Sequence, residues 1–321
     1  MLTISVVVPA TDAPPTLPRC LEGIARSDAR AAERVPGWSA AELVVVDDSG
    51  LSAAAARNAG LRRATRDVAV FVDADVELHA DALTRIHDAF LADPSLTGVF
   101  GAYDDTPAVR TTVSMFRNLL HHHVHQRGAG RAETFWTGIG GLRRDAALAV
   151  GGFDDHRYPH PSIEDVELGM RLVAAGASIE LDPTIQGTHL KQWTLRSMLL
   201  TDLTRRGVPW VALLLRHKRV PTTLNLGWRH RASAVASAVG LLSVARRHPA
   251  AFAGSLAVLV GLNQDLYRLL ARRTGGLRMA AGIGLHALHH LVALAAVPAG
   301  VLAHMRRRPG PCDREDPTWL S

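Results

Sequence analysis

The sequence has few cysteines, and its N-terminal residues do not resemble a signal peptide. Each of these features argues against a class of protein. Only Cys20 and Cys312 occur among its 321 residues, and neither lies in a C-x-x-C pair. The pattern therefore predicts neither a zinc site nor a disulfide framework. The apolar run Ile4–Val8 is short, follows no basic region and ends at Pro9, so it does not predict a signal peptide. A secreted location is not expected.

Positive charge is scarce in the first part of the chain and abundant in the second. Residues 1–190 carry 17 Lys and Arg against 25 Asp and Glu, and residues 191–321 carry 19 against 5. A basic half is typical of proteins that bind nucleic acid or an anionic membrane surface. No basic patch is interleaved with aromatic residues, as single-strand binding requires. Because the basic residues flank apolar runs, we expect membrane lipids and no nucleic acid as partners.

Short apolar runs alternate with helical spacing in the first part of the chain. Strands are predicted at 4–8, 43–46 and 68–72, and helices at 17–27, 52–64, 81–92 and 164–176. This alternation predicts an α/β fold with a mostly parallel, doubly wound sheet flanked by helices. Ligands of such sheets bind at the carboxyl ends of the strands.

Acidic residues follow the third predicted strand. If the chain is still extended there, Asp73, Asp75 and Glu77 point to one face, since strand side chains have a period of two. Three neighbouring carboxylates repel one another unless a cation intervenes. Mg²⁺ and Mn²⁺ prefer oxygen ligands and commonly bridge to substrate phosphates. The set predicts a metal–diphosphate site, and a solvated strand end is the alternative.

Other polar residues are candidates for substrate binding or catalysis. Asp48 ends the second strand, where a carboxylate accepts hydrogen bonds from a base or ribose or forms an Asx-turn. Arg57, on the next helix, would reach a base or phosphate, or lie solvated. Asp165 is either a cap on its helix or a general base that takes a proton from a sugar hydroxyl. His189 would bind a metal or phosphate, or be structural, and Trp193 would stack on a sugar.

Apolar stretches occupy the end of the chain, at 232–245, 250–263 and 279–303. Only the last is long enough to cross a bilayer, which takes about 20 residues. The basic amphipathic segment 265–273 suits a membrane interface. No simple threading puts all the basic clusters on one side, so topology is left open, and a soluble helical subdomain is the alternative.

Taken together, the motifs resemble those of the family 2 glycosyltransferases. The resemblance covers roughly residues 3–193, and its segments are S-V-V-V-P-A (5–10), V-V-V-D-D-S (44–49), A-R-N-A-G (56–60), F-V-D-A-D (71–75), G-I-G-G-L-R-R (138–144), G-G-F-D-D (151–155) and E-D-V-E-L (164–168). It implies a GT-A-type, Rossmann-like fold, a nucleotide-sugar donor, a divalent cation (Mg²⁺ or Mn²⁺) and an inverting reaction. The second strand is followed by D-S-G where the family usually has D-G-S, and Lys191–Trp193 is a reduced form of the Q-x-x-R-W segment of processive members.

By position, the resemblance also assigns roles to single residues. Pro9, Thr11, Asp48, Arg57 and Asp73 would bind the donor; Asp73, Asp75, Glu77 and His189 would hold the metal; Asp165 would be the general base; and Gly140, Glu164, Lys191 and Trp193 would meet the acceptor or phosphates.

These observations favour an enzyme that transfers a sugar to a hydroxyl of a lipid-linked or glycan acceptor near the membrane. Transfer to polyprenyl phosphate, a non-catalytic membrane-bound sugar-binding or scaffold protein, and a nucleotidyltransferase are the alternatives. The expected domains are a catalytic domain (1–195), a basic juxtamembrane linker or helices (196–231), apolar membrane-associated helices (232–305) and a polar tail (306–321). We expect the protein at the cytoplasmic membrane of the cell envelope, with its catalytic domain facing the cytoplasm.

Overall fold

The computed structural model describes residues 2–217 and 227–306, which fall into two compact units. The first unit comprises residues 2–108 and 125–191, and the second comprises 109–124, 192–217 and 227–306. Residues 218–226 of the expected linker, the expected tail beyond Arg306, and Cys312 lie outside the described residues.

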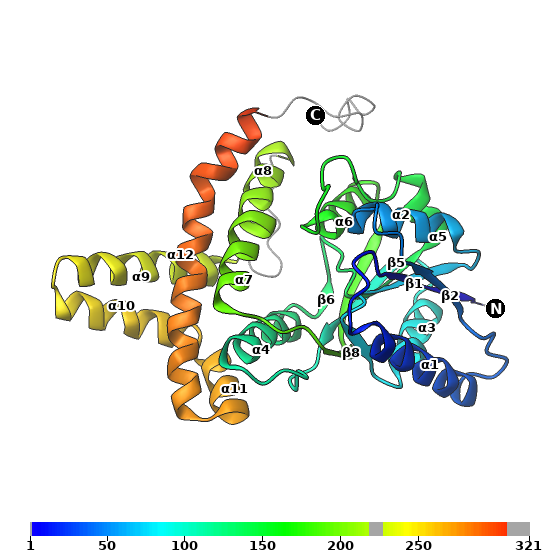
Figure 1. The fold of residues 1–321 in the computed structure, drawn as a ribbon, viewed down its shortest axis with the longest axis horizontal. Coiled ribbons are helices and arrows are strands. Elements are labelled where there is room, and N and C mark those ends of the chain that lie inside the picture. The colour runs from blue at the N-terminus through cyan, green and yellow to red at the C-terminus, as the bar shows by residue number, and fades with distance from the viewer. Residues whose placement is uncertain (1, 218–226, 307–321) are drawn as a thin grey trace. The chain divides into compact units, whose positions relative to one another are not determined.

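The first unit alternates strands and helices, as the apolar spacing predicts (Figure 1). Its strands are β1 (Ile4–Pro9), β2 (Glu42–Val46), β3 (Val68–Val72), β4 (Val76–Leu78), β5 (Leu96–Tyr103), β6 (Gly130–Arg131), β7 (Ile139–Arg143) and β8 (Ser178–His189). Its helices are α1 (Leu17–Arg34), α2 (Ala53–Arg63), α3 (Ala82–Ala92), α5 (Arg144–Ala149) and α6 (Glu164–Ala174). Ser52 caps α2 as predicted, because its side chain accepts a hydrogen bond from the Ala55 N–H at 3.2 Å.

The strands form one eight-stranded sheet in the order β2-β1-β3-β7-β5-β8-β4, with β6 paired to β8. Among the described strands, β1–β2, β1–β3 and β5–β8 pair in parallel, and the other four pairs are antiparallel. The predicted α/β class is confirmed, but the sheet is mixed and not mostly parallel. Two of the antiparallel pairs arise from β7, a glycine-rich strand that lies between β3 and β5 in a region that gave no clear strand signal. The other two arise because β4 and β6 pair with β8.

The two faces of the sheet carry different helices: α1 and α3 lie on one side, and α2, α5 and α6 on the other (Figure 1). Alternate residues of β1 and β3, such as Val6 and Val70, join the core under α1 and α3. Val7 points the other way, toward α2. A Cβ on Gly60 of α2 would lie 2.2 Å from Val7 Cγ1, so only glycine allows this helix to approach the sheet so closely.

The chain turns after β3 and does not stay extended through the acidic motif. The Val76 N–H donates to the Asp73 carbonyl at 2.9 Å, and the chain then resumes as β4. Because a turn breaks the two-residue alternation of a strand, the predicted common face of Asp73, Asp75 and Glu77 is wrong. Each carboxylate contacts different partners.

The second unit is helical. It contains α4 (Thr112–Arg127, of which residues 112–124 belong here), α7 (Leu195–Leu200), a π-helix η1 (Thr201–Gly207), α8 (Val208–His217), α9 (Trp228–Ala245), α10 (Pro249–Leu262), α11 (Gln264–Thr274) and α12 (Gly276–Arg306). Its core joins Phe116 and Leu119 of α4 to Met198, Tyr267 and Leu270. The first part of the expected linker is therefore helical.

The helices of the second unit have an unusual distribution of side-chain size. Residues of α9 that are buried are small, among them Ser233, Ser237 and Gly240, whereas Val235 and Leu241 are exposed. Small residues inside and large apolar ones outside are typical of helices packed in lipid. Among the described residues, α12 alone is long and apolar enough to cross a membrane, and 22% of its apolar window is buried.

Candidate active site

Arg57 lies at the centre of the candidate site. Its side chain is 7% exposed, and its guanidinium donates to Glu164 Oε1 at 2.6 Å and to Asp73 Oδ1 at 2.7 Å. The cation therefore links the end of β3 to the start of α6, which are 91 positions apart in the sequence. A buried charge needs such partners, because an unpaired one would be strongly destabilising. The geometry makes Arg57 a link between two acidic segments.

Asp165 lies at the start of α6, beside this link. Its carboxylate is half-buried and accepts hydrogen bonds from Thr137 through the backbone N–H at 3.1 Å and the hydroxyl at 3.2 Å. Burial, and then the negative charge of Glu164, raise the pKa of Asp165 to about 6, although Arg57 opposes the shift. A carboxylate with such a pKa is ionised near neutral pH and is a stronger base than an ordinary aspartate.

Asp75 sits at the end of the turn that follows β3. Its Oδ2 lies 3.7 Å from His189 Nε2 and 3.9 Å from Lys191 Nζ. Burial favours the neutral acid, but His189 and Lys191 outweigh it and hold the pKa of Asp75 below its ordinary value. The ring of His189 stacks on Tyr103 at 4.1 Å, which fixes its orientation. Asp75 and His189, both predicted to hold the metal, thus lie beside Lys191, which was predicted to meet the acceptor or phosphates.

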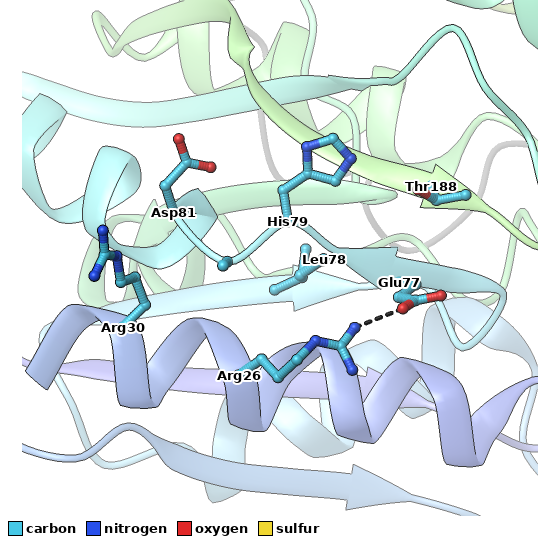
Figure 2. A pocket seen from close by; sticks show the side chains of 8 residues that line it. Arg26, Arg30, Glu77, Leu78, His79, Asp81 and Thr188 are labelled. Atoms are coloured by element: carbon cyan, nitrogen blue, oxygen red, sulfur yellow. Dashed lines mark hydrogen bonds and ion pairs between the residues drawn. The ribbon is translucent and has the colours of Figure 1, made fainter.

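Glu77 points toward α1. Its carboxylate accepts hydrogen bonds from Arg19 and from Arg26, each at 2.5 Å. Figure 2 shows Arg26 extending from α1 to Glu77 at one wall of an open pocket of about 470 Å³. The other lining residues are Arg30, Leu78, His79, Ala80, Asp81 and Thr188. Neither Asp75 nor Asp165 lines this pocket, so it is separate from these two carboxylates.

Of the four residues predicted to hold the metal, Asp75 and His189 would give up the weakest contacts on binding a cation. In the described ranges, no group of three or more His, Cys, Asp or Glu is already arranged to hold an ion. The contacts of Asp75 to His189 and Lys191 are longer than hydrogen bonds, so an ion would displace only weak interactions. Asp73 and Glu77 would have to exchange short arginine contacts for the metal.

The other predicted residues lie in different surroundings. Pro9 ends β1 opposite Val46, and Thr11 lies in the turn that follows. Asp48 accepts a hydrogen bond from the Gly50 N–H at 2.9 Å, which is the Asx-turn geometry. Gly140 is within β7, where a Cβ would lie 2.5 Å from the Trp136 carbonyl oxygen. Trp193 belongs to the second unit and is 5% exposed there.

Two residues that contact the predicted site residues, Thr137 and Tyr103, were not predicted from the sequence. Thr137 supplies both hydrogen bonds from the preceding loop to Asp165, and Tyr103 supports His189. Thr137 directly precedes the glycine-rich segment that forms β7, which is the signal that would have drawn attention to it. Tyr103 carries no such signal, because its pairing with His189 depends on β5 lying beside β8.

Comparisons with known proteins identify relatives of this chain. The family model described as "Glycosyl transferase family 2" matches residues 49–151. The pre-mycofactocin glycosyltransferases of two Mycobacterium tuberculosis strains, CDC 1551 / Oshkosh and ATCC 25618 / H37Rv, are each 26% identical over 294 residues. The match covers 82% of this chain and 61% of each relative, so the chain spans about three fifths of the relatives' length.

A solved structure resembles the fold over almost the whole chain. It is a mannosyltransferase from Pyrobaculum calidifontis in complex with GDP-Man and Mn²⁺, with a TM-score of 0.51 and 18% sequence identity. The alignment covers 96% of this chain and 88% of that chain. The likeness confirms the predicted GT-A-type fold.

Proposed function

We propose that this chain, which belongs to the family 2 glycosyltransferases, transfers a sugar from a nucleotide-sugar donor to a hydroxyl group of a lipid-linked or membrane-proximal acceptor. The reaction is a single displacement that inverts the anomeric carbon. It requires a divalent cation, Mg²⁺ or Mn²⁺.

The observation that carries this proposal is the environment of Asp165. A sugar hydroxyl is a weak nucleophile until a base takes its proton, and a half-buried carboxylate whose pKa is raised to about 6 suits that task near neutral pH. As the acceptor oxygen bonds to the anomeric carbon, Asp165 takes the proton and the nucleoside diphosphate departs with the electrons of its bond to the sugar. A polyprenyl phosphate acceptor is already anionic and would need no such base.

The donor side is built from the turn after β3 and the end of β8. Asp75, with His189 beside it, would hold the cation, and Asp73 and Glu77 would join on exchange of their arginine partners. A cation held there would offset charge on the departing diphosphate. Lys191, half-exposed next to Asp75, would add a positive charge to the same phosphates. Pro9, Thr11 and Asp48 would contact the nucleoside.

The second unit would attach the enzyme to the cytoplasmic membrane, with the first unit in the cytoplasm. Large apolar side chains are exposed on α9, α10 and α12, and α12 is the candidate span. Exposed apolar patches of this kind mark membrane or protein interaction sites. Arginines near the ends of these helices suit anionic headgroups.

Donor hydrolysis by the purified full chain tests the function. The panel contains UDP- and GDP-sugars, including GDP-mannose, each with and without Mn²⁺. Acceptors are membrane lipid extract and pre-mycofactocin, after the name of the relatives. The expected result is cation-dependent release of nucleoside diphosphate from one donor, stimulated by one acceptor. Absence of release from every donor, in protein that is folded and metal-loaded, would favour the non-catalytic alternative.

A further inference from the structure

A group of four histidines in the second unit has no role in the proposed reaction. His286, His289 and His290 lie on one side of α12, since residues three and four apart share a helix face, and His230 reaches them from α9. We call these four residues the histidine cluster. His286 and His290 are 3% and 1% exposed. We propose that the histidine cluster binds a divalent transition-metal ion such as Zn²⁺.

The spacing of the rings fits a metal ion. The ring centres of His230, His289 and His290 are 4.6, 5.6 and 5.9 Å apart. Those of His286, His289 and His290 are 4.4, 5.6 and 6.3 Å apart. Each triangle fits a circle with a radius of about 3.1–3.2 Å, close to the distance of roughly 3.2 Å from ring centre to ion that a zinc–nitrogen bond of 2.0–2.1 Å gives.

Two of the imidazoles already have the supporting contacts that metal ligands require. His289 Nδ1 lies 2.8 Å from Asp202 Oδ2, and His286 Nδ1 lies 2.8 Å from the Tyr267 hydroxyl. Each contact occupies one ring nitrogen and leaves Nε2 for an ion, and the carboxylate–histidine pair is a recurrent support of bound zinc. Asp202 is held in turn by Arg117, which donates to both of its oxygens.

His290 provides an independent reason for a ligand. Both of its ring nitrogens are buried without a hydrogen-bond partner. Leaving a buried polar group unsatisfied is destabilising, so such groups are rare without a function or a bound ligand. Coordination of an ion would satisfy one nitrogen and bring His290 together with His230 and His289.

To bind an ion, imidazole rings of the histidine cluster must rotate from their present orientations. As the side chains stand, no three donor groups in the described parts of the chain are arranged around an ion. The torsion that turns an imidazole about its Cβ–Cγ bond is broad, so His230 and His290 can turn while His286 and His289 keep their contacts to Tyr267 and Asp202. Imidazole nitrogens favour Zn²⁺, Ni²⁺, Cu²⁺ and Fe²⁺ over Mg²⁺. The bound ion would tie α9 to α12, and through Asp202 and Tyr267 to η1 and α11.

Metal binding by the full chain in detergent tests this proposal. The protein carries a tag without histidines and the change Asp75→Asn, which weakens the donor-site cation. After chelator treatment, Zn²⁺ alone is added, free metal is removed, and bound zinc is measured by elemental analysis. His156→Ala, an exposed histidine of the first unit, is the matched control.

The expected result is one equivalent of zinc more in the parent and in His156→Ala than in His290→Phe. Co²⁺ in place of Zn²⁺ should give visible d–d absorption that His290→Phe lacks. If His290→Phe does not fold, Tyr267→Phe serves instead, and its zinc affinity should fall about 10–100-fold through loss of the supporting hydroxyl. Equal zinc content and affinity in the parent and the cluster variants would overturn the proposal, whatever the outcome of the glycosyl-transfer assays.

Discussion

Replacement of Asp165 by asparagine separates a catalytic carboxylate from a helix cap. Asparagine keeps the size of the side chain and an oxygen that accepts from Thr137, but it cannot take a proton from an acceptor hydroxyl. Loss of a general base typically lowers the rate about 10²–10⁴-fold. We therefore expect kcat to fall by that factor while donor affinity changes little.

The same substitution should leave the protein no less stable, and the structure gives the reason. The pKa of Asp165 is raised from 3.8 to about 6, so the folded protein disfavours the ionised form by about 3 kcal/mol at neutral pH. Because Asp165 is half-buried, solvent screening reduces this to about 1–2 kcal/mol. Removal of a negative charge from the first turn of α6 costs about 0.3–1 kcal/mol. The net expectation is a gain of about 0–1.7 kcal/mol.

The pH dependence of the difference in stability between the parent and Asp165→Asn follows from the direction of the pKa shift of Asp165. Between about pH 4 and pH 6 the folded parent binds more protons at Asp165 than the unfolded chain does, so its stability falls as pH rises through that window. The variant lacks this titration. Thermal melts should coincide near pH 4 and differ above pH 6, where one kcal/mol corresponds to a shift of about 2–4 °C.

Three outcomes would contradict these expectations for Asp165→Asn. Transfer at the parental rate would leave Asp165 as a cap and favour a polyprenyl phosphate acceptor. A melting temperature several degrees below that of the parent at pH 7.5 would mean that the charge supports the helix. Lost donor affinity with unchanged kcat would place Asp165 in the nucleotide site.

Three further predictions concern the divalent cation, Arg57 and attachment to the membrane. Asp75→Asn should remove most activity and its dependence on Mn²⁺, measured as donor turnover; full turnover of the parent in excess chelator would contradict a metal role. Arg57→Gln should move the acidic limb of the kcat–pH profile to higher pH, because Arg57 lowers the pKa of Asp165. Arg57→Lys keeps the positive charge and should leave that limb nearly in place. Coincident profiles of the parent and both variants would contradict an effect of Arg57 on Asp165. A chain that ends at Arg231 should be soluble, whereas the full chain should stay in the membrane fraction. Equal solubility of the two chains without detergent would exclude attachment through α9–α12. Release of the full chain by high salt alone would mean that its attachment is electrostatic.

Local features of the first unit were predictable because each depends on short stretches of sequence. The β-branched runs at β1 and β3 report burial directly, whereas β2 is only partly buried and exposes Leu43. Ser52 marks the start of α2 through its own side chain. The acidic ends of these strands and the ordered motifs gave the resemblance to the family 2 glycosyltransferases, which a family model matches over residues 49–151. The apolar runs of the second unit predicted α9, α10 and α12 for the same reason.

Pairings between distant residues were not predictable, because they depend on how the chain packs. The position of β7 between β3 and β5 made the sheet mixed, and the turn at Asp73–Asp75 separated the three carboxylates that strand periodicity would have aligned. Arg57 joins Asp73 to Glu164 only because α2 and α6 lie on the same side of the sheet.

The sequence by itself determined which residue types lie at the strand ends, the alternation of strands and helices, and the apolar character of the last third, since periodicity and composition are local properties. Tertiary structure alone decided which charge meets which. Burial beside Glu164 raised the pKa of Asp165, and the convergence of α9 and α12 brought four histidines from two stretches of chain into contact. Electrostatic and coordination chemistry depend on distances of a few ångströms, and only packing sets those distances.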